Sequence, residues 1–469
     1  MKKKIILTVL IALLTVCILG LITACDEPEP SSTEGLTFTL INNDLEYEVS
    51  GYTGSSTDVY IPSTHNDKPV TSIGSYAFFD CDLLTSVVIG DSVTSIGESA
   101  FCYCNMLTSV VIGNNVTSIG ERSFKDCHRL VEVVNKSPNL TVTKGDPLNN
   151  GCVGYYALSV YNSDSGITKS QLIKDRGFIV YSNDREKVLV AYNGTKTALT
   201  LPSYITKINQ RALSNSSTLT SVEIGRNVTD IGESAFSECR SLLSVKIGRN
   251  VKNIGDYAFV FCEKLISIEI PDSVTSLDYS VFNACTSLTN ITVGSNNSAY
   301  KSIDGNLYSK DGKTLIKYAL GKKTETFVVP NEVITLGDMA FSSCAFLTNV
   351  VIGDNVESIG YGTFYSCDLL RNVLIGDSVE SIGDKAFEYC KLLTNVVIGE
   401  SVKSIGNFAF RKCELLTSVE IPDSVIEIGV YAFEDCDSLT IYCEAESQPS
   451  GWSSSWNSSN RPVNWSSKG

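Results

Sequence analysis

Residues 84–104 read LTSVVIGDSVTSIGESAFCYC, and residues 392–413 repeat the pattern as LLTNVVIGESVKSIGNFAFRKC. The repeat length is 23 residues, which is also the spacing of cysteines within each run of repeats. A unit of this size cannot bury its own apolar face and must stack on its neighbours. The sequence therefore predicts a repeat solenoid with an internal cysteine ladder: Cys81, Cys104, Cys127, Cys239, Cys262, Cys285, Cys344, Cys367, Cys390, Cys413 and Cys436.

Each repeat alternates apolar and variable residues before a short Ala-Phe-x-x-Cys segment. Leu84, Val87 and Ile89 follow an L-x-x-V-x-I pattern, which is typical of a short parallel strand with one buried face. The spacing of Ala, Phe and Cys predicts one helical or 3-10 turn per repeat. Eleven phenylalanine turns and one degenerate turn at Leu213 predict one continuous right-handed coil of about twelve 23-residue turns.

Two glycines recur in each repeat, and their replacements distinguish them. The first, as at Gly90, is replaced in other repeats by Pro271, so this position does not require a positive φ angle. The second, as at Gly97, is replaced only by Asn209 and Asp278. Because Asn and Asp best tolerate a left-handed backbone, we expect a positive φ at this second glycine.

The cysteines are expected to be free thiols. Equivalent residues on adjacent coils lie about 4.8 Å apart with parallel Cα–Cβ bonds, beyond the Cβ separation of about 3.8 Å that a disulfide prefers. Cys102, Cys152 and Cys443 lie outside the ladder, and their redox state is left open. With only His65 and His128 and no C-x-x-C pair, no metal site is predicted.

The N-terminus has the features of a targeting segment. Three lysines at positions 2–4 precede an apolar stretch over residues 5–22, and residues 22–25 (ITAC) resemble the lipobox of bacterial lipoprotein signal peptides. This resemblance implies that residues 1–24 are cleaved and that Cys25 carries a lipid anchor. The alternative is an uncleaved membrane helix. Either arrangement predicts export, with residues 25–35 as an acidic, Pro- and Ser-rich tether.

Charge and motif content exclude several classes of function. The formal net charge of −15 argues against binding to nucleic acid or to anionic membrane surfaces. No nucleophile, base and acid are arranged as a catalytic group around either histidine, and no pair of carboxylates can be nominated for glycoside hydrolysis. We therefore expect a protein without catalytic residues or cofactors, which is not an enzyme.

The repeats fall into three blocks that are separated by other segments. Three lead-ins, residues 36–62, 178–202 and 306–330, have the alternation and turn dipeptides of β-hairpins. Residues 135–177 are less regular and could loop outward. The expected order is a β lead-in and repeat block 1 (36–134), a non-repeat insert with a β-hairpin (135–202), repeat block 2 (203–293), a β-hairpin insert (294–330), repeat block 3 (331–441) and a C-terminal cap (442–469).

The repeat motif I-G-x-x-A-F-x-x-C-x-x-L-T-S-V-x-I-P/G is similar to that of the BspA-like leucine-rich repeats of bacterial surface proteins. Residues 47–63, 303–316 and 441–452 also resemble segments of that family, so the resemblance extends over nearly all of 36–465. It implies a surface-exposed repeat protein of the kind often found in host-associated anaerobes. Some members are adhesins that bind matrix proteins or other bacteria. No catalytic or binding residues transfer from the family.

The variable position of the V-x-I strand is the candidate binding surface. In a passive structural spacer this position would be uniformly polar, but in two blocks it is apolar. Exposed apolar stripes usually mark an interaction site, here for an extracellular protein ligand; coverage by an insert or simple strand propensity are alternatives. A carbohydrate site at Trp452, Trp456 and Trp465 is also open, although these residues fit a terminal cap. The candidate surface comprises Val351, Leu374 and Val397, flanked by Thr348, Asn372, Thr394 and Asn395, with Val88, Val111 and Val134 as a second stripe.

Overall fold

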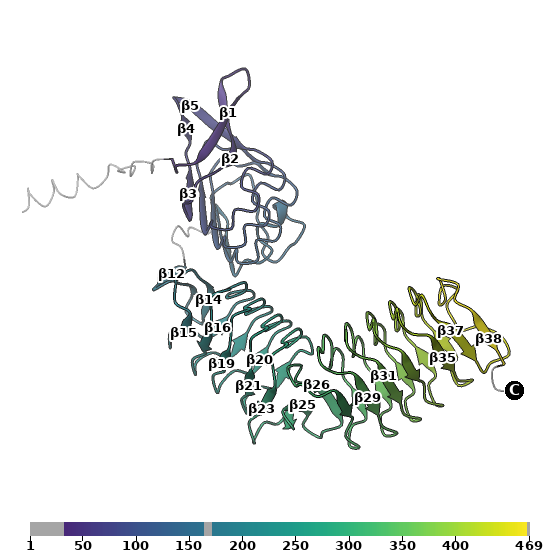
Figure 1. The fold of residues 1–469 in the computed structure, drawn as a ribbon. Helices are drawn as coiled ribbons and strands as arrows, with labels where there is room; N and C mark the ends of the chain where they lie inside the picture. Colours follow the sequence, from purple (N-terminus) through teal and green to yellow (C-terminus); the bar gives the residue numbers. More distant parts are fainter. Residues whose placement is uncertain (1–31, 164–170, 467–469) are drawn as a thin grey trace, which may run out of the picture. The chain divides into compact units, whose positions relative to one another are not determined.

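The computed structural model describes residues 32–163 and 171–466. The chain divides into two compact units, Met1–Lys169 and Ser170–Gly469, and the described residues of each form stacked β-coils (Figure 1). The expectation of one continuous coil is therefore wrong, although the repeat solenoid itself is confirmed. The expected signal peptide (1–24), Cys25 and residues 26–31 of the tether lie outside the described residues.

The first unit has two sheets, and most coils contribute one strand to each. The V-x-I strands pair in parallel in the order β11-β10-β8-β6-β3, and the other sheet runs β1-β2-β5-β7-β9 with β4 beside β5. The bounds of the first sheet are β3 (Asp58–Ile61), β6 (Ser86–Ile89), β8 (Ser109–Ile112), β10 (Glu132–Asn135) and β11 (Ser159–Tyr161). Those of the second are β1 (Leu36–Ile41), β2 (Glu46–Tyr52), β4 (Thr64–His65), β5 (Lys68–Ile73), β7 (Ser95–Ile96) and β9 (Ser118–Ile119).

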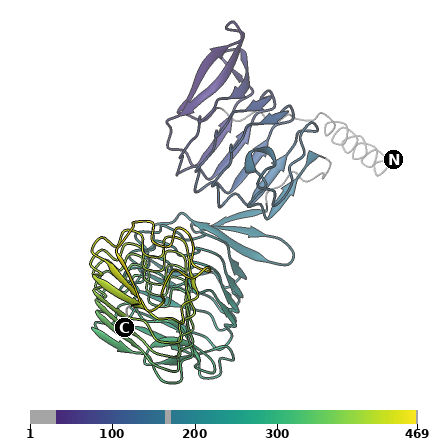
Figure 2. The same cartoon turned by 90° about the vertical axis from the view of Figure 1, so that its right-hand side faces the viewer.

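The second unit repeats this arrangement over blocks 2 and 3, and Figure 2 shows its successive coils in a second view. Its V-x-I strands are β15 (Ala198–Thr200), β17 (Ser221–Glu223), β19 (Ser244–Lys246), β21 (Ser267–Ile270) and β23 (Asn290–Val293), then β27 (Thr326–Val328), β29 (Asn349–Ile352), β31 (Asn372–Ile375) and β33 (Asn395–Val397), then β35 (Ser418–Ile421), β37 (Thr440–Cys443) and β38 (Val463–Trp465). Its short strands are β16 (Lys207–Ile208), β18 (Asp230–Ile231), β20 (Asn253–Ile254), β22 (Ser276–Leu277), β28 (Thr335–Leu336), β30 (Ser358–Ile359), β32 (Ser381–Ile382), β34 (Ser404–Ile405) and β36 (Glu427–Ile428).

Antiparallel strands begin each run of coils, as the lead-in segments predict. β12 (Leu172–Asp175), β13 (Phe178–Ser182) and β14 (Lys187–Tyr192) form one such group, and β24 (Tyr300–Ile303), β25 (Asn306–Ser309) and β26 (Thr314–Lys317) form another. The last strand of each group then pairs in parallel with the first short strand of the coils. Strands of the lead-ins and of the C-terminal segment pair with the sheets of the coils. There are therefore more coils than the twelve expected.

Residues 135–163 form an additional irregular coil rather than an outward loop. β11 pairs in parallel with β10, and the main-chain N–H of Phe124 donates to Gly151 O over 2.8 Å. The coil also contains the short 3-10 helix η1 (Asn150–Cys152). Val142, Val153 and Ala157 are buried in the core of this unit, which gives the segment an apolar reason to fold inward.

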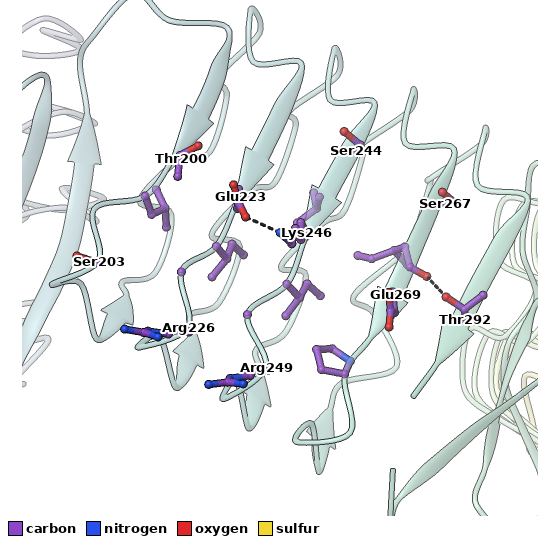
Figure 3. Close-up of a pocket in the computed structure, with 18 of the residues that line it drawn as sticks. Thr200, Ser203, Glu223, Arg226, Ser244, Lys246, Arg249, Ser267, Glu269 and Thr292 are labelled. Atoms are coloured by element: carbon purple, nitrogen blue, oxygen red, sulfur yellow. Dashed lines mark hydrogen bonds and ion pairs between the residues drawn. The ribbon is translucent and has the colours of Figure 1, made fainter. Parts of the chain in front are cut away.

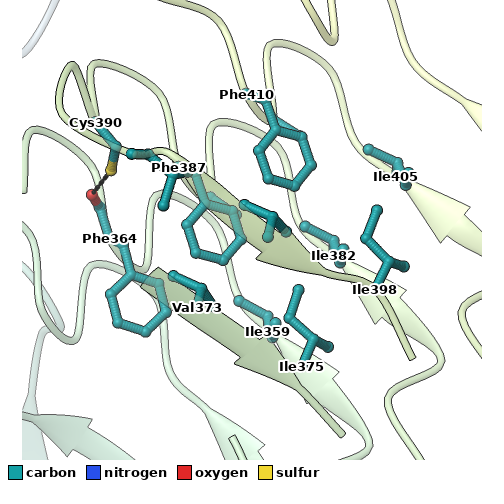
Figure 4. Close-up of a cluster of buried hydrophobic side chains, with 14 of the residues drawn as sticks. Ile359, Phe364, Val373, Ile375, Ile382, Phe387, Cys390, Ile398, Ile405 and Phe410 are labelled. Atoms are coloured by element: carbon teal, nitrogen blue, oxygen red, sulfur yellow. Dashed lines mark hydrogen bonds between the residues drawn. The ribbon is translucent and has the colours of Figure 1, made fainter. Parts of the chain in front are cut away.

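The core of most coils is a stacked phenylalanine beside a buried cysteine (Figure 4). The rings of Phe364 and Phe387 lie 5.1 Å apart at an interplanar angle of 6°, and neighbouring pairs repeat this geometry. Tyr318 continues the stack into the hairpin insert, 5.0 Å from Phe341. The repeat motif alone did not predict this additional ring of the stack, because the insert has no Ala-Phe pair.

The Ala-Phe-x-x-Cys segment is a series of turns, so the predicted helical turn is wrong. Cys104 N–H donates to Phe101 O over 3.3 Å, which is a three-residue reach. However, Ser99, which precedes this turn, and Tyr103, which lies inside it, have positive φ angles of 52° and 62°. Left-handed residues at this spacing recur in most coils and prevent a right-handed helix from propagating.

The second repeat glycine does not adopt the positive φ that the sequence predicts. Gly97 is absent from the positive-φ residues, which include Ser99 two positions later. The physical reason for glycine is close approach between coils, since a Cβ on Gly97 would lie 2.5 Å from Ser75 N. Gly90 also lacks a positive φ, as expected from its replacement by proline.

The C-terminal segment forms a cap over the last coils. Trp452 and Trp456 are only 5% and 4% exposed, and the indole of Trp456 packs edge-on against Phe433 with centroids 6.1 Å apart. The Trp452 indole N–H donates to Val425 O over 3.0 Å, so its polar group is satisfied internally. Trp465 is partly buried against the same core.

Candidate binding surface

The predicted apolar stripe of block 3 is formed in register across adjacent strands. Val351 on β29 pairs with Leu374 on β31, which pairs with Val397 on β33. Leu374 and Val397 are 46% and 56% exposed, whereas Val351 is half-buried. Val328 on β27, which is 61% exposed, extends the stripe by one strand. Sequence reasoning missed Val328 because it lies in the lead-in, where only the alternation of T-F-V-V-P could have indicated it.

Asparagine side chains form a hydrogen-bonded ladder beside this stripe. Asn372 Nδ2 donates to Asn349 Oδ1 over 2.6 Å, and Asn395 Nδ2 donates to Asn372 Oδ1 over 2.7 Å. Asn349 in turn donates to Thr326 Oγ1 over 3.3 Å. Asn349 was not among the predicted residues, although it occupies the same repeat position as Asn372 and Asn395. The ladder fixes the flank of the stripe and leaves few free amide groups there.

The two predicted threonines serve the backbone. The hydroxyl of Thr348 donates to Glu325 O over 3.0 Å, and that of Thr394 donates to Arg371 O over 3.1 Å. Both bonds join consecutive coils. These hydroxyls therefore hold the coils together, and the apolar side chains are the groups left to contact a partner.

A hollow of about 330 Å³ continues the surface beyond Val397. Asn395 and Val397 line one side, and Glu420 and Tyr442 line the other. Glu420 pairs in register with Tyr442, which is 37% exposed. An aromatic ring next to exposed aliphatic residues is a common composition for the centre of a protein interface.

The second stripe is less exposed. Val88 and Val111 are half-buried, and Val134 is only 7% exposed. Val134 pairs with Tyr161 on β11, the strand contributed by residues 135–163. The structure therefore presents more apolar surface on block 3 than on block 1.

A wider groove of about 810 Å³ lies over the V-x-I strands of block 2 (Figure 3). Glu223 and Lys246 form an ion pair of 2.6 Å on its floor, and Arg226 and Arg249 extend from consecutive coils along one side. The groove was not predicted. The signal that could have indicated it is the R-N-V sequence at 226–228 and 249–251, where most other repeats have D-S-V, D-N-V or E-S-V and one has N-N-V.

Two ladder cysteines are buried, and one histidine packs against an aromatic ring. Burial raises the pKa of Cys285 and of Cys344 to about 12, which keeps these thiols protonated and poorly nucleophilic at neutral pH. The His65 ring stacks on Phe38 with centroids 3.9 Å apart. Over residues 32–163 and 171–466, no three His, Cys, Asp or Glu side chains are grouped to hold a metal ion. No helix in that same part of the chain has the length and apolarity to cross a membrane.

Parallel strands from consecutive 23-residue coils, closed over a Phe and Cys ladder, define a leucine-rich repeat solenoid. The chain belongs to the family of BspA-type leucine-rich repeat regions, whose model matches residues 52–153, 191–311 and 318–440 in six copies.

Two solved structures are similar to this chain. A leucine-rich cell surface protein from Faecalibacterium prausnitzii is 29% identical, with a TM-score of 0.50 over 92% of this chain and 98% of that one. The pneumococcal vaccine antigen PcpA is 20% identical, with a TM-score of 0.48 over 89% of this chain and 87% of that one. None of the curated proteins compared with the chain is a significant match.

Proposed function

We propose that this chain is an exported, lipid-anchored cell-surface protein that mediates adhesion by binding another protein. Membership of the BspA-type family and the likeness to a cell surface protein of Faecalibacterium prausnitzii support surface location. The signal-like N-terminus and the lipobox-like residues 22–25 support export and lipid attachment at Cys25. Residues 25–35 would hold the coils away from the membrane.

The observation that carries the proposal is the in-register stripe of Val328, Val351, Leu374 and Val397, in which all but the half-buried Val351 are exposed. Outward β-branched or leucine side chains on four adjacent strands form a contiguous apolar surface, which costs free energy in water unless a partner covers it. The asparagine ladder holds the flank in place. A preorganised surface of this kind loses little conformational entropy on binding.

Two other functions have less support. A passive spacer does not require apolar residues at consecutive outward positions, and polar ones would keep it more soluble. A carbohydrate site on the C-terminal tryptophans requires exposed ring faces, whereas Trp452 and Trp456 are buried in the cap. No catalytic role is proposed.

The test is a binding assay with the triple variant Val351→Thr, Leu374→Thr, Val397→Thr. Threonine is compatible with strands, so the fold is retained while the apolar stripe is removed. Full-length protein displayed on bacteria is first screened against immobilised host matrix proteins and other bacterial cells to obtain a ligand. We expect adhesion to that ligand to fall at least tenfold in the triple variant.

The matched control replaces three exposed apolar residues elsewhere, Leu243, Ile266 and Leu415, by threonine. This control should adhere like the unmodified protein. Adhesion that persists in the stripe variant, or that falls equally in the control, would show that the stripe is not the binding site.

A further inference from the structure

One position of the repeat normally holds a carboxylate that joins consecutive coils. It follows the glycine or proline at the end of the V-x-I strand. Asp91 Oδ1 accepts the main-chain N–H of Asn114 over 3.0 Å, and Asp354 Oδ1 accepts that of Asp377 over 3.2 Å. Asp272 accepts a main-chain N–H from the next coil in the same way. Aspartate therefore contributes to stacking at this position.

Block 2 departs from this rule in two consecutive coils, where Arg226 and Arg249 occupy the position. Both side chains are exposed. Within residues 171–466, neither guanidinium forms an ion pair or a side-chain hydrogen bond. Strands of neighbouring coils lie about 4.8 Å apart, so the two cations repel each other and give up the stabilising carboxylate. In a chain with a net charge of −15, such an uncompensated exchange indicates a functional position.

The two arginines lie along one side of the 810 Å³ groove of block 2 (Figure 3). The groove crosses consecutive strands from Thr200 to Thr292, and its small hydroxyl side chains leave room above the strands. Its floor carries charges of both signs, because Lys246 is paired with Glu223 and a further carboxylate, Glu269, lines the groove. The basic side and the mixed floor are therefore parts of one surface.

We infer that this groove binds an extended polypeptide segment of another protein, and that Arg226 and Arg249 together hold an Asp or Glu side chain of that segment. The planar guanidinium donates two parallel hydrogen bonds to a carboxylate, and two guanidiniums on consecutive coils relieve their mutual repulsion when they share one. The length of the groove across several strands fits an extended chain. This second site does not depend on the block 3 stripe.

The mixed floor argues against a sulfated glycan or another uniform polyanion. A polymer of regularly spaced negative charges would be placed against Glu223 and Glu269 as well as against the arginines, and like charges brought together oppose binding. A polypeptide can present an acidic side chain to the arginines and neutral or basic side chains elsewhere. The acidic segment is therefore the better complement.

The experiment uses the full chain in detergent, with a random dodecapeptide phage library as the probe. Peptides selected on the unmodified protein are compared with those selected on the double variant Arg226→Asp, Arg249→Asp. That variant restores the residue that other coils carry, so we expect it to fold and to stack normally. The charge-matched control is Lys323→Asp, Lys391→Asp, at two exposed lysines outside the groove.

We expect the selected peptides to be enriched in Asp and Glu relative to the library. The best acidic peptide, measured by fluorescence anisotropy, should lose at least tenfold in affinity on the arginine double variant and less than twofold on the control. The same peptide with its Asp and Glu residues replaced by Asn and Gln should bind at least tenfold more weakly. The inference is overturned if the selected peptides are not enriched in Asp and Glu, or if the arginine variant binds the peptide equally well. It is also overturned if the unmodified protein binds heparin or inorganic phosphate through the two arginines but binds no peptide.

Discussion

The thiol of Cys390 donates a hydrogen bond to the main-chain carbonyl oxygen of Phe364, one coil earlier, over 3.1 Å (Figure 4). That oxygen also accepts the N–H of Cys367 over 3.2 Å, so the thiol occupies its second lone pair. The carbonyl is buried and would otherwise be only partly satisfied. The same bond recurs along the ladder, from Cys104 to Phe78, Cys127 to Phe101, Cys239 to Leu213, Cys262 to Phe236, Cys285 to Phe259, Cys367 to Phe341, Cys413 to Phe387 and Cys436 to Phe410.

Replacing Cys390 by alanine should therefore destabilise the stack. The variant loses the thiol hydrogen bond and leaves a small cavity, at a combined cost of about 1–2 kcal/mol. Urea unfolding followed by circular dichroism measures the change. Cys152→Ala is the control, at a partly exposed cysteine outside the ladder whose thiol donates to Pro147 O at the surface over 3.0 Å, and it should change stability by less than about 0.5 kcal/mol. Equal effects would contradict a special role for the ladder thiol.

The ladder cysteines should be reduced but hidden from reagents. We expect a thiol titration of the native protein without reductant to detect few of them, because all but the half-exposed Cys81 are buried. In denaturant, the same titration should detect most of the eleven thiols. A peptide map that showed disulfides between ladder positions would contradict this prediction, and iodoacetamide labelling before reduction provides the check.

Folding stability should fall in alkali. Burial raises the pKa of Cys285 and Cys344 to about 12 in the folded chain, from an ordinary value of 9.0. Their contribution is complete below pH 9 and is lost between pH 9 and 12, because the unfolded chain releases these protons first. Each such thiol should add a slope of about 1.4 kcal/mol per pH unit in that range. Urea midpoints measured across it should decrease, and less steeply in Cys285→Ala, Cys344→Ala.

One buried lysine has the opposite effect on the pH dependence of folding stability. Burial lowers the pKa of Lys317 to about 8 from 10.5, while its ammonium donates to Asn283 Oδ1 over 2.5 Å and to Met339 O over 2.7 Å. Between these two pKa values the unfolded chain holds more protons, so this group makes stability rise with pH. In Lys317→Met the decrease above pH 9 should therefore be steeper. An unchanged slope would show that Lys317 titrates normally.

Two glycines should respond oppositely to alanine. In Gly383→Ala the new Cβ would lie 2.7 Å from the carbonyl group of Gly360, so the coils must separate, at a cost of about 1–3 kcal/mol. At Gly353 no atom lies within 4 Å of an added Cβ, and alanine should be neutral or stabilising by up to about 1 kcal/mol. Thermal unfolding of the two variants tests this. A destabilised Gly353→Ala would contradict the close-approach explanation.

Lipid attachment is tested at Cys25. In a bacterial host, Cys25→Ala should leave an uncleaved precursor without lipid, because the modified residue of the lipobox is missing. Radiolabelled palmitate incorporation and the apparent mass on gels report the two effects, with Cys17→Ala, within the apolar stretch, as the control. Unchanged processing and labelling in Cys25→Ala would exclude the proposed anchor.

The repeat made much of the fold and part of the surface predictable. The period placed Phe364, Phe387 and their equivalents in one stack, and the alternation placed Leu374 and Val397 outward. The helical turn and the positive φ at Gly97 were wrong, because both were inferred from local preference. Stacking stabilises left-handed residues such as Tyr103, whose cost in isolation is about 1–2 kcal/mol.

The sequence by itself determined the repeat architecture, since a 23-residue unit with one apolar face can be buried only by another copy of itself. It also determined which side chains face inward. Only the tertiary structure decided how the irregular segments join the stacks, with Tyr318 replacing a phenylalanine and residues 135–163 folding into an additional coil. It also decided which polar groups remain free to contact a partner. The hydroxyl of Thr348 is used in a hydrogen bond to the preceding coil, whereas the side chain of Arg226 is exposed.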